Sequence, residues 1–193
     1  KTGHFEKVLR YTRPLFGKAK VLDMGCADGF FLPSLSNYFP EVVCADIDKG
    51  HCESAEWLKN KIGAKHVTVK CTEGAGLNEL CSAYKGSFDL IFLLEVMEHV
   101  GEPGTMFKDK LEFLEKLSGC LTPGGRIIIT VPVMTGPRFL LQRTGLALLG
   151  MYREPLTWGE ILQAGLFNNT TSLEQRWWPQ SHLGFNHHKL IRI

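Results

Sequence analysis

The sequence predicts an α/β protein with a doubly wound, mainly parallel sheet and flanking helices. Short apolar runs alternate with segments whose apolar residues recur at helical spacing, and this alternation is typical of a parallel sheet. Residues 88–94 are almost continuously apolar, as expected for a central strand that is covered on both faces. Two other runs end on an acid, and a glycine turn follows the first of them. Because ligands bind at the carboxyl ends of parallel strands, these acids mark the expected site.

The composition fits one globular domain. The chain has 193 residues, of which 44% are hydrophobic and 22% charged, and its net charge is +2. This weak charge does not indicate a nucleic-acid partner, which requires a denser basic face. The six cysteines form no Cys-x-x-Cys pair, so we interpret them as reduced thiols of an intracellular, cytoplasmic protein. No signal peptide and no apolar run of roughly 20 residues is recognisable, and nothing predicts an oligomeric state.

The first half of the chain begins with an expected helix over residues 4–16. An apolar strand follows it and ends at Asp23 and Met24. The next expected elements are a helix, a strand, a second helix and a third strand, over residues 30–39, 41–48, 51–62 and 66–71. Pro33 must lie in the first turn of the helix over 30–39, because proline lacks the N–H that a later position needs.

In the second half, a helix over residues 77–84 precedes the apolar strand 87–94, and a helix over 107–120 follows it. Residues 121–125, Leu-Thr-Pro-Gly-Gly, have the composition of a turn. This turn leads into a fifth strand over residues 126–132. The alternation of strands and helices stops there, although residues 187–193 have the pattern of a helix start with Asn186 as its cap.

The turn after the first strand is the first candidate site. Residues 23–29 read Asp-x-Gly-x-x-x-Gly, and the helix expected after them has unpaired N–H groups that attract a carboxylate or phosphate. This spacing differs from the Gly-x-Gly-x-x-Gly of dinucleotide-binding proteins. Asp46 lies 23 residues after Asp23, where an acid can accept hydrogen bonds from ribose hydroxyls. Asp48 is an alternative for this role, and either acid can instead cap the next helix.

Four motifs in this order resemble those of class I S-adenosylmethionine-dependent methyltransferases. They are the glycine turn with Ala27 in place of the family's middle glycine, the acid Asp46, the strand opening Phe-Asp-Leu-Ile at residues 88–91, and the Leu-x-Pro-Gly-Gly turn at residues 121–125. The resemblance covers residues from about 4 to 132 and implies a Rossmann-like sheet with S-adenosylmethionine as cofactor. A nicotinamide-binding protein is the alternative for this region, but its glycine spacing differs.

The resemblance also implies roles for individual residues. Asp23 would help to hold the cofactor's amino group, Asp46 its ribose and Ile47 its adenine ring. Glu73 is expected at the adenine amino group, with Thr72 as an alternative. The complete set of expected cofactor-binding residues is Asp23, Gly25, Cys26, Ala27, Gly29, Asp46, Ile47, Glu73 and Leu94.

A second cluster of candidate residues follows the fourth strand. Glu95, Glu98 and His99 have the spacing i, i+3, i+4, which places all three on one face if a helical turn begins there. The pattern resembles two metal-assisted subfamilies, the ubiquinone-biosynthesis O-methyltransferases and the small-RNA 3′-terminal 2′-O-methyltransferases. Both take a further ligand from a later histidine, so the expected metal ligands are Glu95, Glu98, His99 and His182. Alternatively, His99 is the general base or contacts the substrate, with Glu95 as the other candidate base, or the cluster is structural.

The expected organisation is a single methyltransferase domain over residues 1–193. It would consist of a cofactor-binding core, residues 1–132, and a substrate cover, residues 133–188. Within the cover, residues 139–152 are apolar with a basic interruption, so they can cap the active site or make a peripheral membrane contact. The family sheet usually has seven strands, and its C-terminal strands are missing from this sequence, which we expect to be truncated.

These inferences lead to one principal function and two alternatives. We expect an enzyme that moves a methyl group from S-adenosylmethionine to an oxygen or nitrogen of a small-molecule acceptor. The first alternative is a metal-assisted O-methyltransferase of a quinone-type or RNA 3′-end substrate, with a divalent metal as a second cofactor. The other alternative is a methyltransferase-like binding protein without catalysis.

Overall fold

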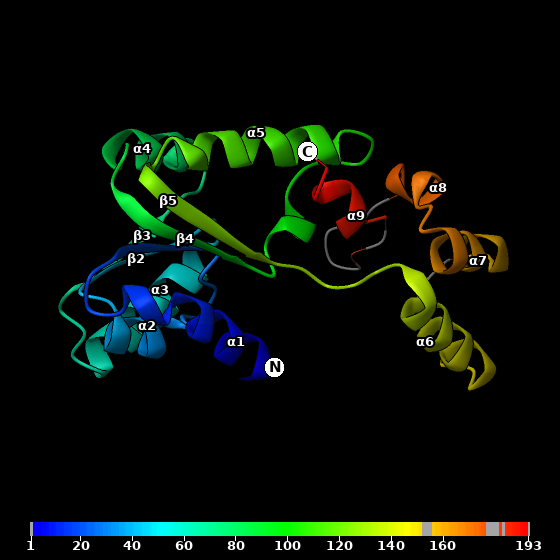
Figure 1. Ribbon diagram of the computed structural model, residues 1–193, viewed down its shortest axis with the longest axis horizontal. Helices are drawn as coiled ribbons and strands as arrows, with labels where there is room; N and C mark the ends of the chain where they lie inside the picture. The colour runs from blue at the N-terminus through cyan, green and yellow to red at the C-terminus, as the bar shows by residue number, and fades with distance from the viewer. Residues whose placement is uncertain (1, 152–155, 177–181, 183, 193) are drawn as a thin grey trace. The chain divides into compact units, whose positions relative to one another are not determined.

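The computed structural model describes residues 2–151, 156–176, 182 and 184–192 (Figure 1). The chain divides into two compact units. The first comprises residues 1–94 and 114–130, and the second comprises residues 95–113 and 131–193. The second unit therefore combines the expected substrate cover with residues 95–113, which the sequence analysis placed in the core.

The first unit contains a five-stranded sheet with the order β3-β2-β1-β4-β5. Its strands are β1 (Lys20–Met24), β2 (Glu41–Asp46), β3 (Val67–Cys71), β4 (Phe88–Leu94) and β5 (Leu121–Thr130). Every pairing between neighbouring strands is parallel, so their carboxyl ends lie along one edge. The predicted parallel fold is confirmed, and the described residues contribute fewer than seven strands to it.

Helices flank this sheet on both faces (Figure 1). One face carries α1 (Thr2–Thr12), α2 (Leu32–Tyr38) and α3 (Lys49–Lys61), and the short 3₁₀ helix η1 (Arg13–Leu15) follows α1. The other face carries α4 (Gly76–Ala83) and the end of α5 (Met106–Ser118). Crossover helices on both faces explain why the interior strand β4 is apolar on both of its faces.

Aromatic rings connect the sheet to its helices in the core of the first unit. Phe31 meets Phe92 of β4 edge-on, with ring centroids 5.6 Å apart, and Phe39 packs against the same ring. Cys26 and Cys44 are buried here, and both are free thiols. The buried residues of this cluster are Val8, Ala19, Val21, Cys26, Phe31, Leu32, Leu35, Phe39, Val42, Cys44, Ala55, Ala64, Val67, Leu90 and Phe92. Each large side chain contributes roughly 1.5–3 kcal/mol by burial, so this cluster fixes the strand ends around the site.

The Pro-Gly-Gly segment belongs to β5, which corrects its prediction as a turn. β5 begins at Leu121, and its pairing with β4 shifts register between Phe88 and Leu90. Residues 122–125 therefore form a bulge. Gly125 is required there, because a Cβ atom would lie 2.8 Å from the carbonyl oxygen of Phe88.

The described elements of the second unit are helical. They are η2 (Met97–His99), the first part of α5, α6 (Gly136–Leu148), α7 (Trp158–Phe167), α8 (Thr171–Glu174) and α9 (His187–Leu190). The predicted cap of α9 is confirmed, because the side chain of Asn186 accepts a hydrogen bond from the N–H of His188. A capping box of Thr157 and Glu160 fixes the start of α7. Among the described residues, no helix is long and apolar enough to cross a membrane.

Candidate functional site

The glycine turn lies at the carboxyl edge of the sheet, between β1 and α2. Gly25 and Gly29 have φ angles of +81° and +78°, a left-handed conformation that glycine adopts without steric strain. The N–H groups of Gly25 and Cys26 both donate to the carbonyl of Ala45 in β2, at 2.7 and 3.1 Å. A Cβ atom on Gly29 would lie 3.4 Å from Ala55 of α3, so the turn packs closely against that helix.

Asp46, the last residue of β2, organises this turn. Its Oδ2 accepts a hydrogen bond from the N–H of Ala27 at 2.8 Å, and its Oδ1 accepts one from the N–H of Asp48 at 2.9 Å. Ala27 has a φ of +46°, which is unfavourable for a residue with a side chain. The charge-assisted bond to Asp46 offsets this strain. Each carboxylate oxygen keeps a further lone pair, so Asp46 can still accept hydrogen bonds from a ligand.

Asp23, on the neighbouring strand β1, is a second acid at this edge of the sheet, and it is buried. Its side chain is almost inaccessible, and its Oδ2 has no partner among the described residues. Burial, and then the nearby charge of Asp46, raises the pKa of Asp23 to about 7. An unsatisfied buried acceptor costs about 1–3 kcal/mol. Oδ2 is therefore suited to a hydrogen-bond donor or cation that enters the site from solvent.

The two other acids near the turn have structural partners. Asp48 caps α3, because its Oδ1 accepts a hydrogen bond from the N–H of His51 at 3.0 Å. The Oδ1 of Asp28 lies 2.9 Å from the Nδ1 of His51, and this hydrogen bond lowers the pKa of Asp28 and raises that of His51. The sequence left the helix cap open for either acid. In the structure Asp48 has this role, while Asp46 faces the turn.

The remaining predicted cofactor residues lie just past the same strand ends. Ile47 and Glu73 are exposed beyond β2 and β3, and Leu94 ends β4. Thr72, the alternative to Glu73, is buried, and its N–H donates to the carbonyl of Asp46 at 2.7 Å. These positions agree with the expected edge of the sheet, and contact of these side chains with a cofactor stays a prediction.

The histidine cluster belongs to the second unit and differs from its prediction. Glu95 has a φ of +59°, and only the short helix η2 follows it, so no regular helix aligns the two glutamates with His99. Instead, ligand atoms of Glu98, His99 and His182 lie within 4.8 Å of one another. Glu95 is not a member of this group. The left-handed backbone at Glu95 is the reason, because it breaks the helical spacing on which the prediction relied.

Burial shifts the pKa of two members of this cluster, Glu98 and His182. Both carboxylate oxygens of Glu98 lack a hydrogen-bond partner among the described residues, and burial raises its pKa to about 7. The rings of His99 and His182 meet edge-on with centroids 4.7 Å apart. Burial, and then His99, lowers the pKa of His182, which favours its neutral imidazole. The cluster therefore offers lone pairs of the kind that bind a cation.

A buried lysine lies close to this cluster. Lys110 of α5 is fully buried and donates a hydrogen bond to the carbonyl of Val100. Burial lowers the pKa of Lys110 to about 8, although the charge of Glu98 opposes that shift. The positive charge of Lys110 lowers the pKa of Glu98, against the larger effect of burial, and so favours its charged form.

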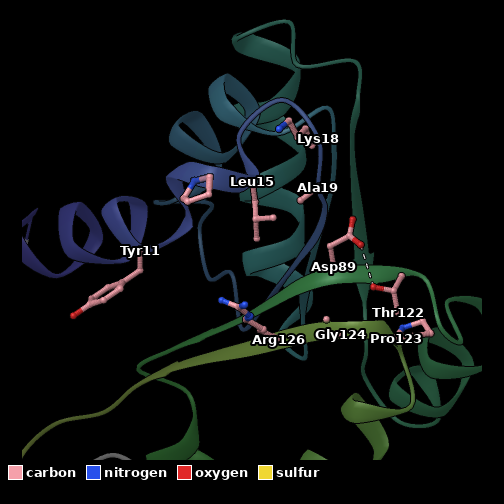
Figure 2. Close-up of a pocket in the computed structure, with 11 residues that line it drawn as sticks. Tyr11, Leu15, Lys18, Ala19, Asp89, Thr122, Pro123, Gly124 and Arg126 are labelled. Carbon is pink, nitrogen blue, oxygen red and sulfur yellow. Dashed lines mark hydrogen bonds between the residues drawn. The ribbon is translucent and has the colours of Figure 1, made fainter.

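A cavity of about 480 Å³ lies at the opposite, amino-terminal ends of β1 and β4 (Figure 2). Lys18 and Arg126 contribute to its wall. Asp89 also lines it, but both of its oxygens have partners: Oδ2 accepts from the N–H of Lys20 at 2.9 Å and Oδ1 from the hydroxyl of Thr122 at 3.0 Å. This cavity is therefore separate from the glycine turn. Asp89 in its wall links β4 to β1 and β5 through these two hydrogen bonds.

A family model described as a methyltransferase domain matches residues 4–186. This chain belongs to the methyltransferase family. The match includes both the glycine turn and the histidine cluster, so the methyltransferase resemblance inferred from residues 4–132 extends through most of the second unit.

Curated relatives of this methyltransferase are named ubiquinone biosynthesis O-methyltransferase. The protein of Ruegeria pomeroyi is 30% identical over 127 residues, which make up 64% of this chain and 44% of the relative. The protein of Azorhizobium caulinodans is 30% identical over 142 residues, or 74% of this chain and 51% of the relative. The chain thus spans about half the length of the curated relatives it matches.

Solved structures share the fold of this methyltransferase. The YcgJ protein from Bacillus subtilis aligns with a TM-score of 0.54 at 17% identity, covering 76% of this chain and 58% of that one. The [4+2]-cyclase SpnF aligns with a TM-score of 0.50 at 16% identity, covering 64% and 42% of the two chains. At these identities the similarity shows the fold alone, and one of the proteins with this fold is named as a cyclase. Function must therefore be argued from the site.

The glycine turn fits S-adenosylmethionine, the cofactor that the methyltransferase family implies. The cofactor carries a positive amino group and two ribose hydroxyls. The site offers a buried oxygen of Asp23 that has no partner in the described part of the chain, and the Asp46 carboxylate, which has spare lone pairs. Three contributors were not predicted from the sequence: the N–H of Ala27 and the pair of Asp28 with His51 at the turn, and Lys110 at the histidine cluster. Each acts through a residue distant in sequence, so no local pattern marks it.

Proposed function

We propose that this chain binds S-adenosylmethionine at the turn between β1 and α2 and transfers its methyl group to an oxygen or nitrogen of a small-molecule acceptor. The observation that carries the proposal is the pair of acids at the ends of β1 and β2. Asp23 has a buried oxygen with no partner among the residues that the structure describes, which suits the amino group of the cofactor. Asp46 fixes the turn and keeps lone pairs for the ribose. Ile47, exposed beside Asp46, would lie against the adenine.

The chemistry requires alignment and a proton acceptor. The cofactor supplies an electrophilic methyl group: the acceptor atom forms a bond to its carbon while the bond from sulfur to that carbon breaks. The protein contributes by holding the acceptor in line. A hydroxyl or amine acceptor also loses a proton, and we assign its removal to His99, with Glu95 as the alternative. Imidazole suits this role because it titrates near neutral pH.

The names of the relatives support one class of acceptor. Their names describe O-methyltransferases, so we favour a hydroxyl oxygen over nitrogen. The second unit would provide the cover for this acceptor, because family members place substrate-specific segments after the fifth strand. We also propose a reducing, cytoplasmic location, which the six free thiols support.

Thermal stability with added ligand tests the cofactor site. We expect S-adenosylhomocysteine to raise the melting temperature, because a ligand that binds only the folded chain stabilises it. NAD serves as the comparison and should produce no shift. A shift with NAD and none with S-adenosylhomocysteine would overturn the proposal in favour of a nicotinamide-binding protein.

Transfer itself is tested with methyl-labelled S-adenosylmethionine and a panel of catechols, phenols and amines. Label in a catechol or phenol supports the proposed oxygen acceptor, and label in an amine points to nitrogen. Binding of the cofactor with no labelled product across the panel would favour the non-catalytic binding protein.

One observation favours a metal-assisted form of this function. Glu98, His99 and His182 offer a carboxylate and two imidazoles within 4.8 Å of one another. Such a mixed nitrogen and oxygen set suits Zn²⁺ or Mn²⁺. A cation held there would lower the pKa of an acceptor hydroxyl. A quinone-type diol, with two adjacent oxygens, is the acceptor that this arrangement favours.

Calorimetry with the metal-free chain tests this site. We expect Mn²⁺ or Zn²⁺ to bind, and we expect Glu98→Gln and His182→Ala each to weaken binding at least about tenfold, as loss of one ligand should. His66→Ala is the matched control, because His66 is an exposed histidine of the first unit. Equal affinity of the Glu98→Gln chain and the original chain, or no binding by the original chain, would contradict the metal site.

A further inference from the structure

The six cysteines all belong to the first unit, where they lie in spatial pairs although they are scattered along the sequence. The pairs are Cys26 with Cys44, Cys52 with Cys71, and Cys81 with Cys120. All six are free thiols. Cys71 is the exposed member of these pairs, and it ends β3 at the carboxyl edge of the sheet. Its pair therefore combines access from solvent with proximity to the proposed cofactor site.

Cys52 and Cys71 meet at the backbone that follows β2. The Sγ of Cys52, in the first turn of α3, lies 3.5 Å from the carbonyl oxygen of Asp46 and 3.5 Å from that of Lys70. The Sγ of Cys71 lies 3.9 Å from the carbonyl oxygen of Ile47. The carbonyl of Lys70 belongs to the peptide unit that ends at the Cα of Cys71, so the Cys52 sulfur reaches the backbone of its partner. Both sulfurs thus contact the same short piece of backbone.

The two thiols differ in their access to solvent. Cys71 is exposed, whereas Cys52 is 8% exposed, so an oxidant in solution reaches Cys71 first. Burial, and then the thiol of Cys71, raises the pKa of Cys52 to about 12, so Cys52 stays a protonated thiol until its partner reacts. The contribution of Cys71 to that shift ends once its sulfur carries another group. An exposed thiol beside a shielded one is the arrangement of an oxidisable cysteine with its resolving cysteine.

The carbonyls that these thiols contact belong to the two residues proposed to hold the ribose and the adenine. The carboxylate of Asp46 also fixes the glycine turn through the N–H of Ala27. A disulfide holds its sulfur atoms about 2.05 Å apart and carries no hydrogen, so oxidation would withdraw both thiol contacts from these carbonyls. The start of α3 and the end of β3 would be tied together instead. Oxidation of this pair therefore acts on the backbone that positions Asp46 and Ile47.

We infer that Cys52 and Cys71 form a reversible disulfide, a modification site of this chain, and that the disulfide weakens binding of the cofactor. The disulfide depends on the cysteines alone, whereas its effect on the cofactor rests on the function proposed above. In a reducing compartment the two free thiols are the resting form, and the disulfide forms under oxidising conditions.

A low-molecular-weight disulfide such as oxidised glutathione is a sufficient oxidant. The Cys71 thiol loses its proton, and its sulfur attacks one sulfur of the oxidant. A new S–S bond forms while that of the oxidant breaks, and the released thiolate takes up a proton. Cys52 then loses its proton and attacks the Cys71 sulfur, which releases the second half of the oxidant as a thiol. Two cysteine thiols are thus oxidised to one disulfide, and one glutathione disulfide is reduced to two thiols.

Mass spectrometry after treatment with oxidised glutathione tests the disulfide. We expect the treated chain to contain a cross-link between the peptides of Cys52 and Cys71, with the loss of two hydrogen atoms, and we expect dithiothreitol to reverse it. Calorimetry on the same samples tests the consequence. The cross-linked chain should bind S-adenosylhomocysteine about tenfold more weakly, as expected from a disturbed hydrogen bond to the ligand. Cys71→Ser should form no cross-link to Cys52, and its affinity should be the same before and after treatment.

Cys81→Ser is the matched control, because Cys81 belongs to a pair at the opposite edge of the sheet. The Sγ of its partner Cys120 lies 3.9 Å from the carbonyl oxygen of Cys81, and the carbonyl of Cys120 accepts a hydrogen bond from the N–H of Phe88, the first residue of β4. This variant should keep both the cross-link between Cys52 and Cys71 and the loss of affinity. Retained helicity shows that each sample is folded.

The inference is overturned if treatment leaves a glutathione adduct on Cys71 without the cross-link, or no modification at all. It is also overturned if the cross-linked chain keeps its affinity for S-adenosylhomocysteine, or if Cys71→Ser loses as much affinity on treatment as the original chain does. Failure of the proposed function has a different signature: the reduced chain would not bind S-adenosylhomocysteine, while the cross-link between Cys52 and Cys71 would still form.

Discussion

Asp46→Ala is expected to lower the affinity of the chain for S-adenosylhomocysteine by about a hundredfold or more. The carboxylate has two functions that alanine cannot replace: it holds the N–H of Ala27 and the N–H of Asp48, and it offers lone pairs to the ribose. Hydrogen bonds to a charged group contribute about 1.5–3 kcal/mol each. Losing two such bonds to the ligand is by itself enough to lower the affinity at least about a hundredfold, since each factor of ten in affinity corresponds to about 1.4 kcal/mol. Isothermal titration calorimetry measures the effect directly.

Asp48→Ala is the matched control for this experiment. It removes an acid two residues away that caps α3, so we expect a loss of about 1 kcal/mol in the free energy of unfolding. The affinity for S-adenosylhomocysteine should change by less than about threefold, because the side chain of Asp48 points to the N–H of His51. Equal losses of affinity in the two variants would show that Asp46 acts only on the shape of the turn.

Asp23 should make both stability and cofactor binding depend on pH. Its pKa rises from 3.8 to about 7 on folding, so the unfolded chain loses this proton at a lower pH than the folded chain does. The folded state is therefore increasingly penalised as the pH rises from about 4 to 7, and the penalty is constant above that range. One pKa unit corresponds to about 1.4 kcal/mol, so the full penalty is on the order of 4 kcal/mol.

Binding of the cofactor should show the opposite dependence. A positive amino group prefers the ionised carboxylate, so the affinity for S-adenosylmethionine should rise from pH 5.5 to about 7 by up to roughly tenfold per pH unit, then level off. Asp23→Asn should stabilise the ligand-free chain at about pH 8 and remove both pH dependences, while binding becomes much weaker. Thermal unfolding and calorimetry between about pH 5.5 and 8 measure these quantities.

Asp89→Asn is the control for the Asp23 variant. Asp89 is also an acid of a central strand, but it lies at the amino-terminal end of β4, and both of its oxygens accept hydrogen bonds. We expect this change to leave the pH dependence of cofactor binding intact. If Asp23→Asn binds S-adenosylmethionine with the affinity of the original chain at every pH, Asp23 does not hold the amino group.

The order of strands and helices in the first unit could be predicted because local rules govern it. Apolar runs, helical spacing and glycine or proline turns depend on residues within one element, and the boundaries from α2 to α5 fall within two residues of those expected. Local rules failed at residues 121–125. There the register between β4 and β5 incorporates the expected turn into a strand, and register depends on the partner strand.

The roles of the acids required the folded chain. By sequence alone, Asp46 and Asp48 were both candidates for the ribose and for the helix cap. Only the structure shows that Asp48 meets the N–H of His51 while Asp46 meets the N–H of Ala27, nineteen residues before it. At Glu95 the structure differs from the expected alignment, because the backbone there is left-handed and the group within 4.8 Å consists of Glu98, His99 and His182. A metal or catalytic role of Glu95 stays a prediction. Backbone conformation at one residue has no reliable signal in composition.

The sequence by itself determined the fold class, the glycine turn and the identity of the acids around it, because these depend on residue type and on short spacings. The tertiary structure decided which of those groups have partners. It left Oδ2 of Asp23 and both oxygens of Glu98 without one among the described residues, and it brought His182 to His99. Burial and partnership arise only when distant segments pack, so the physical chemistry of these groups could not be derived before the fold was known.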